Sequence, residues 1–377
     1  MKKRVVFTVL GSLLWLSCGN NHDMMYRPEY QYPSYTKDMQ VPTGERGETF
    51  KEIKENPFVE VSSQPVSTFS VDVDRAAYSN IRRMIQQGTL PPKDAVRIEE
   101  MINYFDYDYP TPDAQTPSPL RVSYEQAPAP WNTTHYLLCI GLKTKPLDLS
   151  NTPASHLVFL IDVSGSMMDY NKLPLLKSSL KLLLQNLKPQ DKVSIVTYAS
   201  GTQVALEPTS VREREKIEKV LDGLEAGGAT SGERGIQLAY EQAHKAFIKG
   251  GNNRIILATD GDFNVGINNP NDLKAFIEKQ REGGVYLSVL GFGMGNYRDD
   301  MSETLADSGN GNYAYIDNLT EAKKVLVNEF GGTLFTVAKD VKLQVEFNPK
   351  YVKQYKLLGY ENRMLANEDF TDDKKDA

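Results

Sequence analysis

The chain has 377 residues, 40% of them hydrophobic, which fits two or three folded domains and excludes a disordered or collagen-like protein. Its 43 lysines and arginines against 49 acidic residues give a formal net charge of −6, and this acidic balance argues against a nucleic-acid binder. Two cysteines exclude a disulfide framework and a four-cysteine zinc site, and four scattered histidines argue against a histidine-rich metal site.

The N-terminal segment has the pattern of an export signal. Basic residues 2–4 precede an apolar stretch over 5–16, which is too short to span a bilayer. A small residue before Cys18 resembles the lipobox of bacterial lipoproteins, which implies removal of residues 1–17 and lipidation of Cys18. A plain secretory peptide is the alternative. The expected location is therefore the bacterial cell envelope, lipid-anchored at the outer membrane on its periplasmic or surface face.

The next segments predict a tether and a first folded region. Residues 18–64 alternate tyrosines and prolines without a helical or strand period, which is typical of an extended tether. Residues 65–150 form an N-terminal flanking domain. Its expected strands cover 67–74, 120–125 and 135–142, and its expected helices cover 76–87 and 96–105. The inward face of the first helix is predicted to carry Tyr78, Ile81, Met84 and Ile85.

An aspartate pair and a cysteine in this first region are candidates for metal binding and for a disulfide. Asp72 and Asp74 could suggest calcium, but no further acids stand at loop spacing, and we interpret both as solvated residues at a strand end. Cys139 lies in an apolar run and, if Cys18 carries lipid, has no partner within the chain. We therefore expect Cys139 to be a small core residue.

From 151 to 336 the pattern changes to strands and helices in alternation. The expected strands are 157–161, 193–198, 202–206, 254–258, 286–292 and 312–316, and the expected helices are 173–187, 212–224, 231–248, 272–280, 301–306 and 321–335. The continuous apolar run over 157–161 is typical of a strand buried on both faces. This alternation predicts an α/β fold, a mostly parallel six-stranded sheet with helices on both faces.

The C-terminal segment, residues 337–377, changes character again. Apolar and polar residues alternate over 341–347, which predicts a half-exposed strand that needs a partner sheet. We expect it to return to the first region, so that the α/β unit is inserted in a smaller, β-rich flanking domain. Because no closing element follows that strand, the C-terminal flanking segment is either incomplete or naturally short.

Small hydroxyls and carboxylates follow the predicted strands of the α/β unit. They are Asp162, Ser164, Ser166, Thr230 and Asp260. Ligands of open α/β sheets bind at the carboxyl ends of the strands. Hard oxygen ligands of this kind suit Mg²⁺, with Mn²⁺ or Ca²⁺ as alternatives. Either aspartate alone could instead cap a helix, which strand-to-helix loops favour.

Together these residues resemble the metal-ion-dependent adhesion site of von Willebrand factor type A (VWA) domains. The matching elements are Asp-x-Ser-x-Ser over 162–166, Thr230 after a glycine-rich turn, and Thr-Asp-Gly over 259–261. Residues 68–74 and 97–105 further resemble bacterial secreted VWA lipoproteins, in which N- and C-terminal flanking regions bracket the VWA unit. The resemblance implies a Rossmann-like VWA domain over 151–336.

The resemblance also implies roles for these residues. Ser164, Ser166 and Thr230 would supply hydroxyl ligands, while Asp162 and Asp260 would bind through water or orient the serines. A partner protein's Asp or Glu carboxylate would complete the coordination of the metal. Asp262 and Asn264 either line the rim of this site or are solvated loop residues.

The predicted function is therefore metal-dependent protein binding by a lipid-anchored envelope protein that is not an enzyme. A structural envelope protein with a metal-stabilised VWA fold is one alternative. A phosphoaspartyl-type hydrolase using Asp162 is another, but such enzymes usually carry a second acid two places later, where this chain has Ser164. They also use a lysine, and none follows in a comparable loop after a strand.

Overall fold

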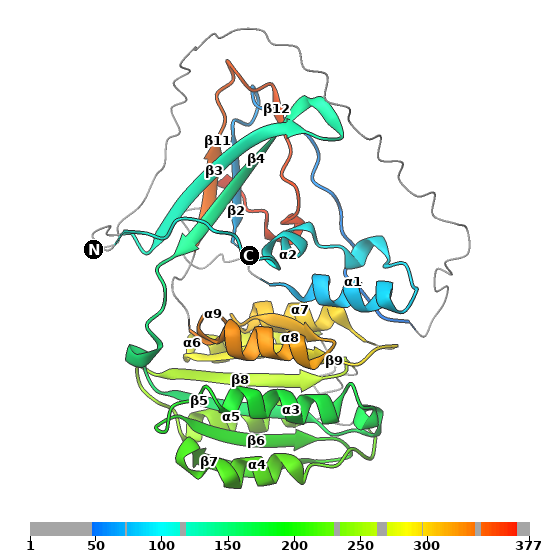
Figure 1. Cartoon of the computed structure of the whole chain (residues 1–377), viewed down its shortest axis with the longest axis vertical. Coiled ribbons are helices and arrows are strands. Elements are labelled where there is room, and N and C mark those ends of the chain that lie inside the picture. The colour runs from blue at the N-terminus through cyan, green and yellow to red at the C-terminus, as the bar shows by residue number, and fades with distance from the viewer. Residues whose placement is uncertain are drawn as a thin grey trace, which may run out of the picture.

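The computed structural model describes residues 47–71, 74–113, 118–229, 234–261, 270–295, 297–335 and 341–367. An α/β unit forms one end of the molecule, and a flanking unit of two helices and three narrow β-ribbons forms the other (Figure 1). Among these residues, no helix has both the length and the apolar character that crossing a membrane requires. The signal segment, Cys18 and the predicted tether up to residue 46 lie outside the described residues. The prediction of a tether is wrong for residues 47–64, which contact the folded body: Glu48 pairs with Arg83 at 2.6 Å, and the Thr49 N–H donates a 2.9 Å hydrogen bond to the Tyr297 carbonyl.

A six-stranded sheet forms the centre of the α/β unit. Its strands lie in the order β10-β9-β8-β5-β6-β7, and all neighbouring pairs are parallel except β6 and β7. The strands are β5 Ser155–Asp162, β6 Lys192–Tyr198, β7 Thr202–Ser210, β8 Asn252–Thr259, β9 Val285–Phe292 and β10 Tyr313–Ile316. The predicted α/β fold with six mostly parallel strands is confirmed.

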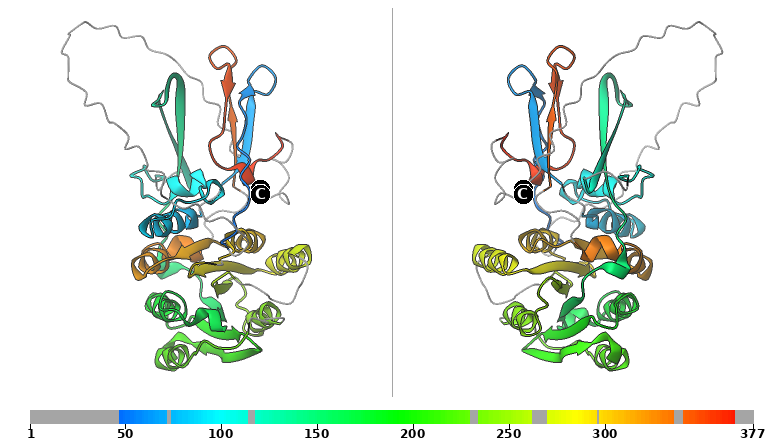
Figure 2. Two further views of the ribbon diagram at one scale, coloured as in Figure 1. Left: turned by 90° about the vertical axis from the view of Figure 1, so that its right-hand side faces the viewer. Right: turned by 90° about the vertical axis from the view of Figure 1, so that its left-hand side faces the viewer.

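Helices cover both faces of this sheet, as the edge-on views show (Figure 2). They are α3 Leu173–Leu184, α4 Arg214–Asp222, α5 Gly235–Lys245, α6 Pro270–Glu282, α7 Asp299–Ser308, α8 Leu319–Lys323 and α9 Phe330–Leu334. The fully buried strand β5 explains why two hydrophobic cores form. Leu157 and Phe159 point into one core, and Val158 and Leu160 point into the other.

Short helical turns complete the α/β unit. One helix was expected over 321–335, but a π-helical turn at Lys324–Asn328 separates α8 from α9. The 3₁₀ turns of this unit are Gly165–Met168 and Val211–Glu213, and a third at Leu149–Asn151 lies in the chain that leads into β5. The turn at Gly165–Met168 directly follows the predicted Asp-x-Ser motif.

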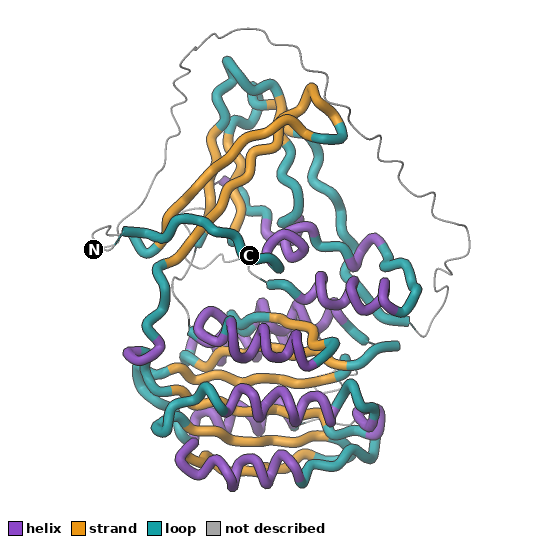
Figure 3. Tube along the Cα trace, in the orientation of Figure 1, coloured by secondary structure: helices purple, strands orange, loops and turns teal. Residues whose placement is uncertain are grey.

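The flanking unit combines segments from before and after the α/β unit, coloured blue to cyan and red in Figure 1, and Figure 3 shows its helices and paired strands at the end of the molecule opposite the large sheet. Its helices are α1 Ala76–Gln86 and α2 Ile98–Asn103, with 3₁₀ turns at Lys93–Ala95 and Glu361–Arg363. Its three antiparallel ribbons pair β1 Val59–Glu60 with β12 Gln354–Tyr355, β2 Val66–Ser70 with β11 Lys342–Glu346, and β3 Leu120–Ala129 with β4 Asn132–Thr144. Strand β11 lies opposite β2 with Leu343 facing Phe69, so the chain returns to the first region after the α/β unit.

Three expectations for the flanking unit are wrong. Cys139 is exposed, because β3 and β4 pair only with each other among the described strands, and its sulfur lies 3.7 Å from the Tyr109 hydroxyl. Asp74 is buried, and its Oδ1 accepts a hydrogen bond from the Tyr313 N–H at the edge of the large sheet. Ile85 of α1 is 56% exposed. Asp72 lies outside the described residues.

The face that α1 buries is partly polar because the helix packs beside the edge strand β10. The Ser79 hydroxyl donates a 2.7 Å hydrogen bond to the Tyr315 carbonyl. The Arg82 guanidinium binds the carboxylates of Asp317 and Glu321 at 2.6 and 2.8 Å. The helix therefore covers a sheet edge that would otherwise present unpaired backbone groups, and hydrophobic spacing alone did not predict this contact.

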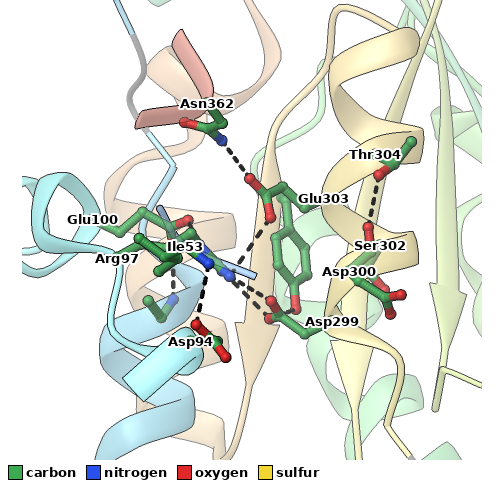
Figure 4. Close-up of polar contacts among 12 residues, drawn as sticks. Ile53, Asp94, Arg97, Glu100, Asp299, Asp300, Ser302, Glu303, Thr304 and Asn362 are labelled. Carbon is green, nitrogen blue, oxygen red and sulfur yellow. Dashed lines mark hydrogen bonds and ion pairs between the residues drawn. The ribbon is translucent and has the colours of Figure 1, made fainter. Parts of the chain in front are cut away.

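A buried ion-pair cluster also joins the two units (Figure 4). Arg97, next to α2, contacts the carboxylates of Glu100, Asp299 and Glu303, the last two from α7. Asn362, from the C-terminal segment, donates a 2.6 Å hydrogen bond to Glu303. Three stretches that are distant in the sequence therefore meet at one end of α7.

Candidate metal centre

Asp162 is the last residue of β5 and is completely buried. Its Oδ1 accepts a 2.8 Å hydrogen bond from the Ser164 N–H, whereas its Oδ2 has no hydrogen-bond partner within the described part of the chain. Burial raises the pKa of Asp162 to about 6, and the nearby Asp260 carboxylate adds to this increase. A buried carboxylate oxygen without a partner costs free energy, so this atom is suited to accept a further ligand.

The two serines follow in a tight turn. The hydroxyl oxygens of Ser164 and Ser166 lie 3.0 Å apart, and Ser164 is buried while Ser166 is exposed. Neither Asp162 nor Ser164 caps α3, because that helix begins at Leu173 with Lys172 in the N-cap position. The alternative of a helix-capping Asp162 is therefore wrong, and the turn presents one buried and one accessible hydroxyl beside the Asp162 carboxylate.

A second loop is bound to this turn. The Gly227 N–H donates to the Val163 carbonyl at 2.8 Å, and the Gly165 N–H donates to the Gly228 carbonyl at 2.9 Å. Gly228 has a φ of +81°, and a Cβ there would lie 2.3 Å from the Ser200 Oγ. Thr230 itself lies outside the described residues, but the chain that leads into it is held against the serine turn.

Asp260 follows β8 and is also completely buried. Its Oδ2 accepts an ion-paired hydrogen bond from the Lys172 Nζ at 2.9 Å. The next residue, Gly261, has a φ of +95° and donates its N–H to the Thr259 Oγ1 at 3.0 Å. Because Gly261 has this left-handed φ and is not helical, Asp260 does not stand in the N-cap position of a helix either.

Lys172 is a site residue that sequence reasoning missed. The lysine of a phosphoaspartyl enzyme is expected in a loop after another strand, whereas Lys172 lies in the same connection as Asp162, between β5 and α3. Its side chain is 6% exposed, and its charged end reaches the carboxylate that follows β8. The feature of the sequence that could have pointed to Lys172 is its place directly before the apolar helix predicted at 173.

Apolar side chains are exposed around the serine turn. Met168 and Tyr170, from the connection that follows Ser166, are 68% and 82% exposed. Met294, 39% exposed, lies in the glycine-rich turn after β9, and the neighbouring Gly293 packs against the Lys172 stem. Asp262 and Asn264 lie outside the described residues.

The donor set fits a hard divalent cation. The described residues supply two buried carboxylates and two serine hydroxyls at adjoining strand ends, and one carboxylate oxygen has no hydrogen bond. Across the part of the chain that the structure describes, this site included, no three histidines, cysteines or acids gather in a way that could hold a metal. A cation at this site would therefore depend on hydroxyl and water oxygens, which Mg²⁺ accepts.

Comparisons with protein families agree with the fold. The von Willebrand factor type A domain matches residues 156–328, and a family described as von Willebrand factor matches residues 44–139. A family described as the C-terminal part of the uncharacterized protein YfbK matches residues 332–377. Together the three matches cover most of the described chain.

Two curated relatives and one solved structure give the degree of similarity. The uncharacterized protein YfbK of Escherichia coli is 50% identical over 333 residues, 87% of this chain and 58% of that protein. The uncharacterized protein sll0103 of Synechocystis is 29% identical over 193 residues, 50% of this chain and 44% of that protein. The chain thus spans about half the length of these relatives. A von Willebrand factor type A structure from Catenulispora acidiphila is 17% identical, with a TM-score of 0.42 over 59% of this chain and 51% of its own.

Proposed function

Because the chain is a VWA domain protein, we propose that its α/β unit binds a divalent cation at the end of β5 and, through that cation, a carboxylate of another protein. The observation that carries this proposal is the buried Asp162 Oδ2, which has no hydrogen bond among the described residues. The adjoining hydroxyls of Ser164 and Ser166 supply the neutral ligands that such a cation would need.

Each residue has a distinct role in this proposal. Ser164, Ser166 and Thr230 would offer hydroxyl oxygens to the cation. Asp162 and Asp260 would hold metal-bound water or orient the serines. Mg²⁺ is the expected cation, with Mn²⁺ or Ca²⁺ as alternatives, because all three prefer oxygen ligands.

The partner is proposed to present an Asp or Glu side chain. If the direct protein ligands are neutral hydroxyls, the cation keeps enough positive charge to attract an outside carboxylate. The exposed Met168 and Tyr170 would add apolar contact around that charged centre. We propose a binding protein rather than an enzyme, because a phosphoaspartyl enzyme that used Asp162 would usually carry a second acid two places later, where this chain has Ser164.

The proposed location follows from the N-terminal segment. A lipid on Cys18 would anchor the protein in the bacterial envelope, at the outer membrane and on either its periplasmic or its surface face. Labelling with a lipid precursor tests this step, and the label should be lost in Cys18→Ala. The net charge of −6 is consistent with a protein rather than a nucleic acid as partner.

A pull-down from envelope extract tests the proposed function. The bait is the full chain with Mg²⁺, with EDTA in place of Mg²⁺, or as Asp162→Asn with Mg²⁺. Asp222→Asn is the matched control, because Asp222 is exposed on α4, where it pairs with Lys181. We expect a partner to be retained only by the wild type and Asp222→Asn with Mg²⁺. A partner retained equally in every arm would contradict metal-dependent binding.

Thermal melting separates the main alternative from the proposal. If the cation binds the native state only, millimolar Mg²⁺ should raise the melting temperature of the wild type but not that of Asp162→Asn. A shift in melting temperature without any captured protein would favour the metal-stabilised structural role. Phosphatase turnover that Asp162→Asn abolishes would favour the hydrolase.

A further inference from the structure

A buried lysine contacts the proposed metal centre. The Lys172 side chain is 6% exposed, and its Nζ lies 2.9 Å from the Oδ2 of the fully buried Asp260. Its stem crosses Gly293, where a Cβ would lie 2.3 Å from the Lys172 Cε and 2.9 Å from its Cγ. Gly293 also has a φ of +80°, which an L side chain rarely adopts. The lysine is therefore held in a groove that only glycine leaves open.

This ion pair changes the charge of the site. The two carboxylates of Asp162 and Asp260 would together carry two negative charges, and the Lys172 ammonium group offsets one of them. A divalent cation would then leave the centre with one net positive charge instead of none. Because these side chains are buried, solvent screens their interactions less than it would at the surface.

We propose that Lys172 tunes the metal centre, weakening its affinity for the cation and strengthening its affinity for the partner's carboxylate. The ammonium group repels the incoming cation and competes for Asp260. It also leaves the loaded centre more positive, which favours a carboxylate ligand. This inference rests on the proposed function, since it concerns a residue beside the same site.

The proposal predicts opposite changes in two measured affinities. Lys172→Met keeps the length of the apolar stem and removes the charge. We expect it to bind Mn²⁺ at least about tenfold more tightly than the wild type, measured by the electron paramagnetic resonance signal of free Mn²⁺. Acetate should displace water from bound Mn²⁺ less readily in the variant, measured by water-proton relaxation. Lys181→Met, at a partly exposed position of α3, is the control and should match the wild type.

Lys172→Met leaves the Asp260 carboxylate without its ammonium partner, and this substitution could unfold the protein. A second variant therefore keeps the proposal testable. Gly293→Ala would place a Cβ against the lysine stem and move the ammonium group away from Asp260 while the sequence charge stays the same. Circular dichroism establishes which variants are folded. Tighter Mn²⁺ binding by a folded Lys172→Met, or by Gly293→Ala if the first variant unfolds, would support the proposal.

The Mn²⁺ measurements distinguish failure of the proposed metal centre from failure of the proposed role of Lys172. If the wild type binds no Mn²⁺ at millimolar concentration, the proposed metal centre fails, and the tuning role fails with it. If the wild type binds Mn²⁺ and the folded variant binds it equally or more weakly, only the role of Lys172 is overturned. Equal acetate affinities in the Mn²⁺-loaded wild type and variant would overturn it as well.

Discussion

Arg97 and Asp299 are 202 residues apart in the chain, yet their side chains form a buried ion pair between the flanking unit and α7. The Arg97 side chain is 5% exposed and the Asp299 side chain is fully buried. Glu100 and Glu303 also contact the same guanidinium. Burial by itself would lower the pKa of Arg97, but the carboxylates of Asp299, Glu100 and Glu303 outweigh it, raise that pKa well above its usual value and keep the arginine charged. The two units are thus joined by a charged cluster as well as by apolar packing.

Removing this arginine should separate the units. Arg97→Met leaves buried carboxylates without their counter-charge, and breaking a buried ion pair in this way costs about 3–5 kcal/mol. We expect a loss of this size in the free energy of unfolding, measured by urea denaturation, and faster proteolysis of the flanking unit. Arg121→Met is the matched control, since Arg121 is 44% exposed and lies 3.9 Å from Asp113. Equal losses in the two variants would contradict a special role for the cluster.

Glu303 should make stability depend on pH. Burial raises the pKa of Glu303 from 4.5 to about 7, the Asp299 carboxylate adds to this, and the Arg97 charge opposes it. Between these pH values the folded state holds a proton that the unfolded state has lost. Stability therefore falls as pH rises from about 4.5 to about 7, by up to about 3 kcal/mol.

Glu303→Gln mimics the protonated side chain and can still accept the hydrogen bond from Asn362. We expect this variant to match the wild type near pH 4.5 and to exceed its free energy of unfolding at pH 7.5, measured by urea denaturation across this range. Glu241→Gln, at an exposed position of α5, should follow the wild-type curve. If the free energies of unfolding of Glu303→Gln and the wild type differed by the same amount at all pH values, the raised pKa of Glu303 would not be the cause of the pH dependence.

The sequence predicted the α/β unit well because its signals are local. The apolar run of β5 and the oxygen-bearing residues after it lie in one continuous stretch, so spacing alone located the Asp162 turn. The flanking unit was predicted less well because long-range contacts decide its burial. Asp74 is buried because the Tyr313 N–H needs an acceptor, and Cys139 is exposed because its ribbon has two strands. Lys172 was missed because its partner Asp260 lies in another loop.

Gly228 should be needed for the loop that leads into Thr230. Gly228→Ala forces a Cβ toward the Ser200 Oγ at 2.3 Å and imposes a side chain on a φ of +81°. We expect a loss of about 1–3 kcal/mol in the free energy of unfolding and weaker Mn²⁺ binding, because the loop that is bonded to Gly165 has to shift. Circular dichroism melts and Mn²⁺ titration measure the two effects.

Gly227→Ala provides the matched control for this loop. A Cβ at Gly227 meets no atom within 4 Å, and its φ lies outside the left-handed region. This variant should keep both wild-type stability and wild-type Mn²⁺ affinity. If Gly228→Ala bound Mn²⁺ as the wild type does, the loop would not contribute to the metal centre, and the proposed role of Thr230 would lose its support.

The apolar rim should affect partner binding without affecting the metal. Tyr170 is 82% exposed beside the serine turn, and exposed aromatic side chains of this kind supply much of the binding free energy in protein interfaces. Once the pull-down has provided the partner, we expect Tyr170→Ser to weaken its affinity by about tenfold, or about 1.4 kcal/mol, measured by calorimetry with Mg²⁺. Mn²⁺ affinity and melting temperature should not change, because the Tyr170 side chain is 82% exposed and its replacement removes little buried contact.

Tyr351→Ser is the control for this last comparison. Tyr351 is 72% exposed in the flanking unit, between β11 and β12, so its substitution removes a similar aromatic area at a distance from the metal centre. It should leave partner affinity at the wild-type value. If both tyrosine variants weakened binding equally, the partner would contact the whole molecule rather than the rim. If neither did, Tyr170 would not contribute to partner binding, and the apolar rim would have no part in the interface.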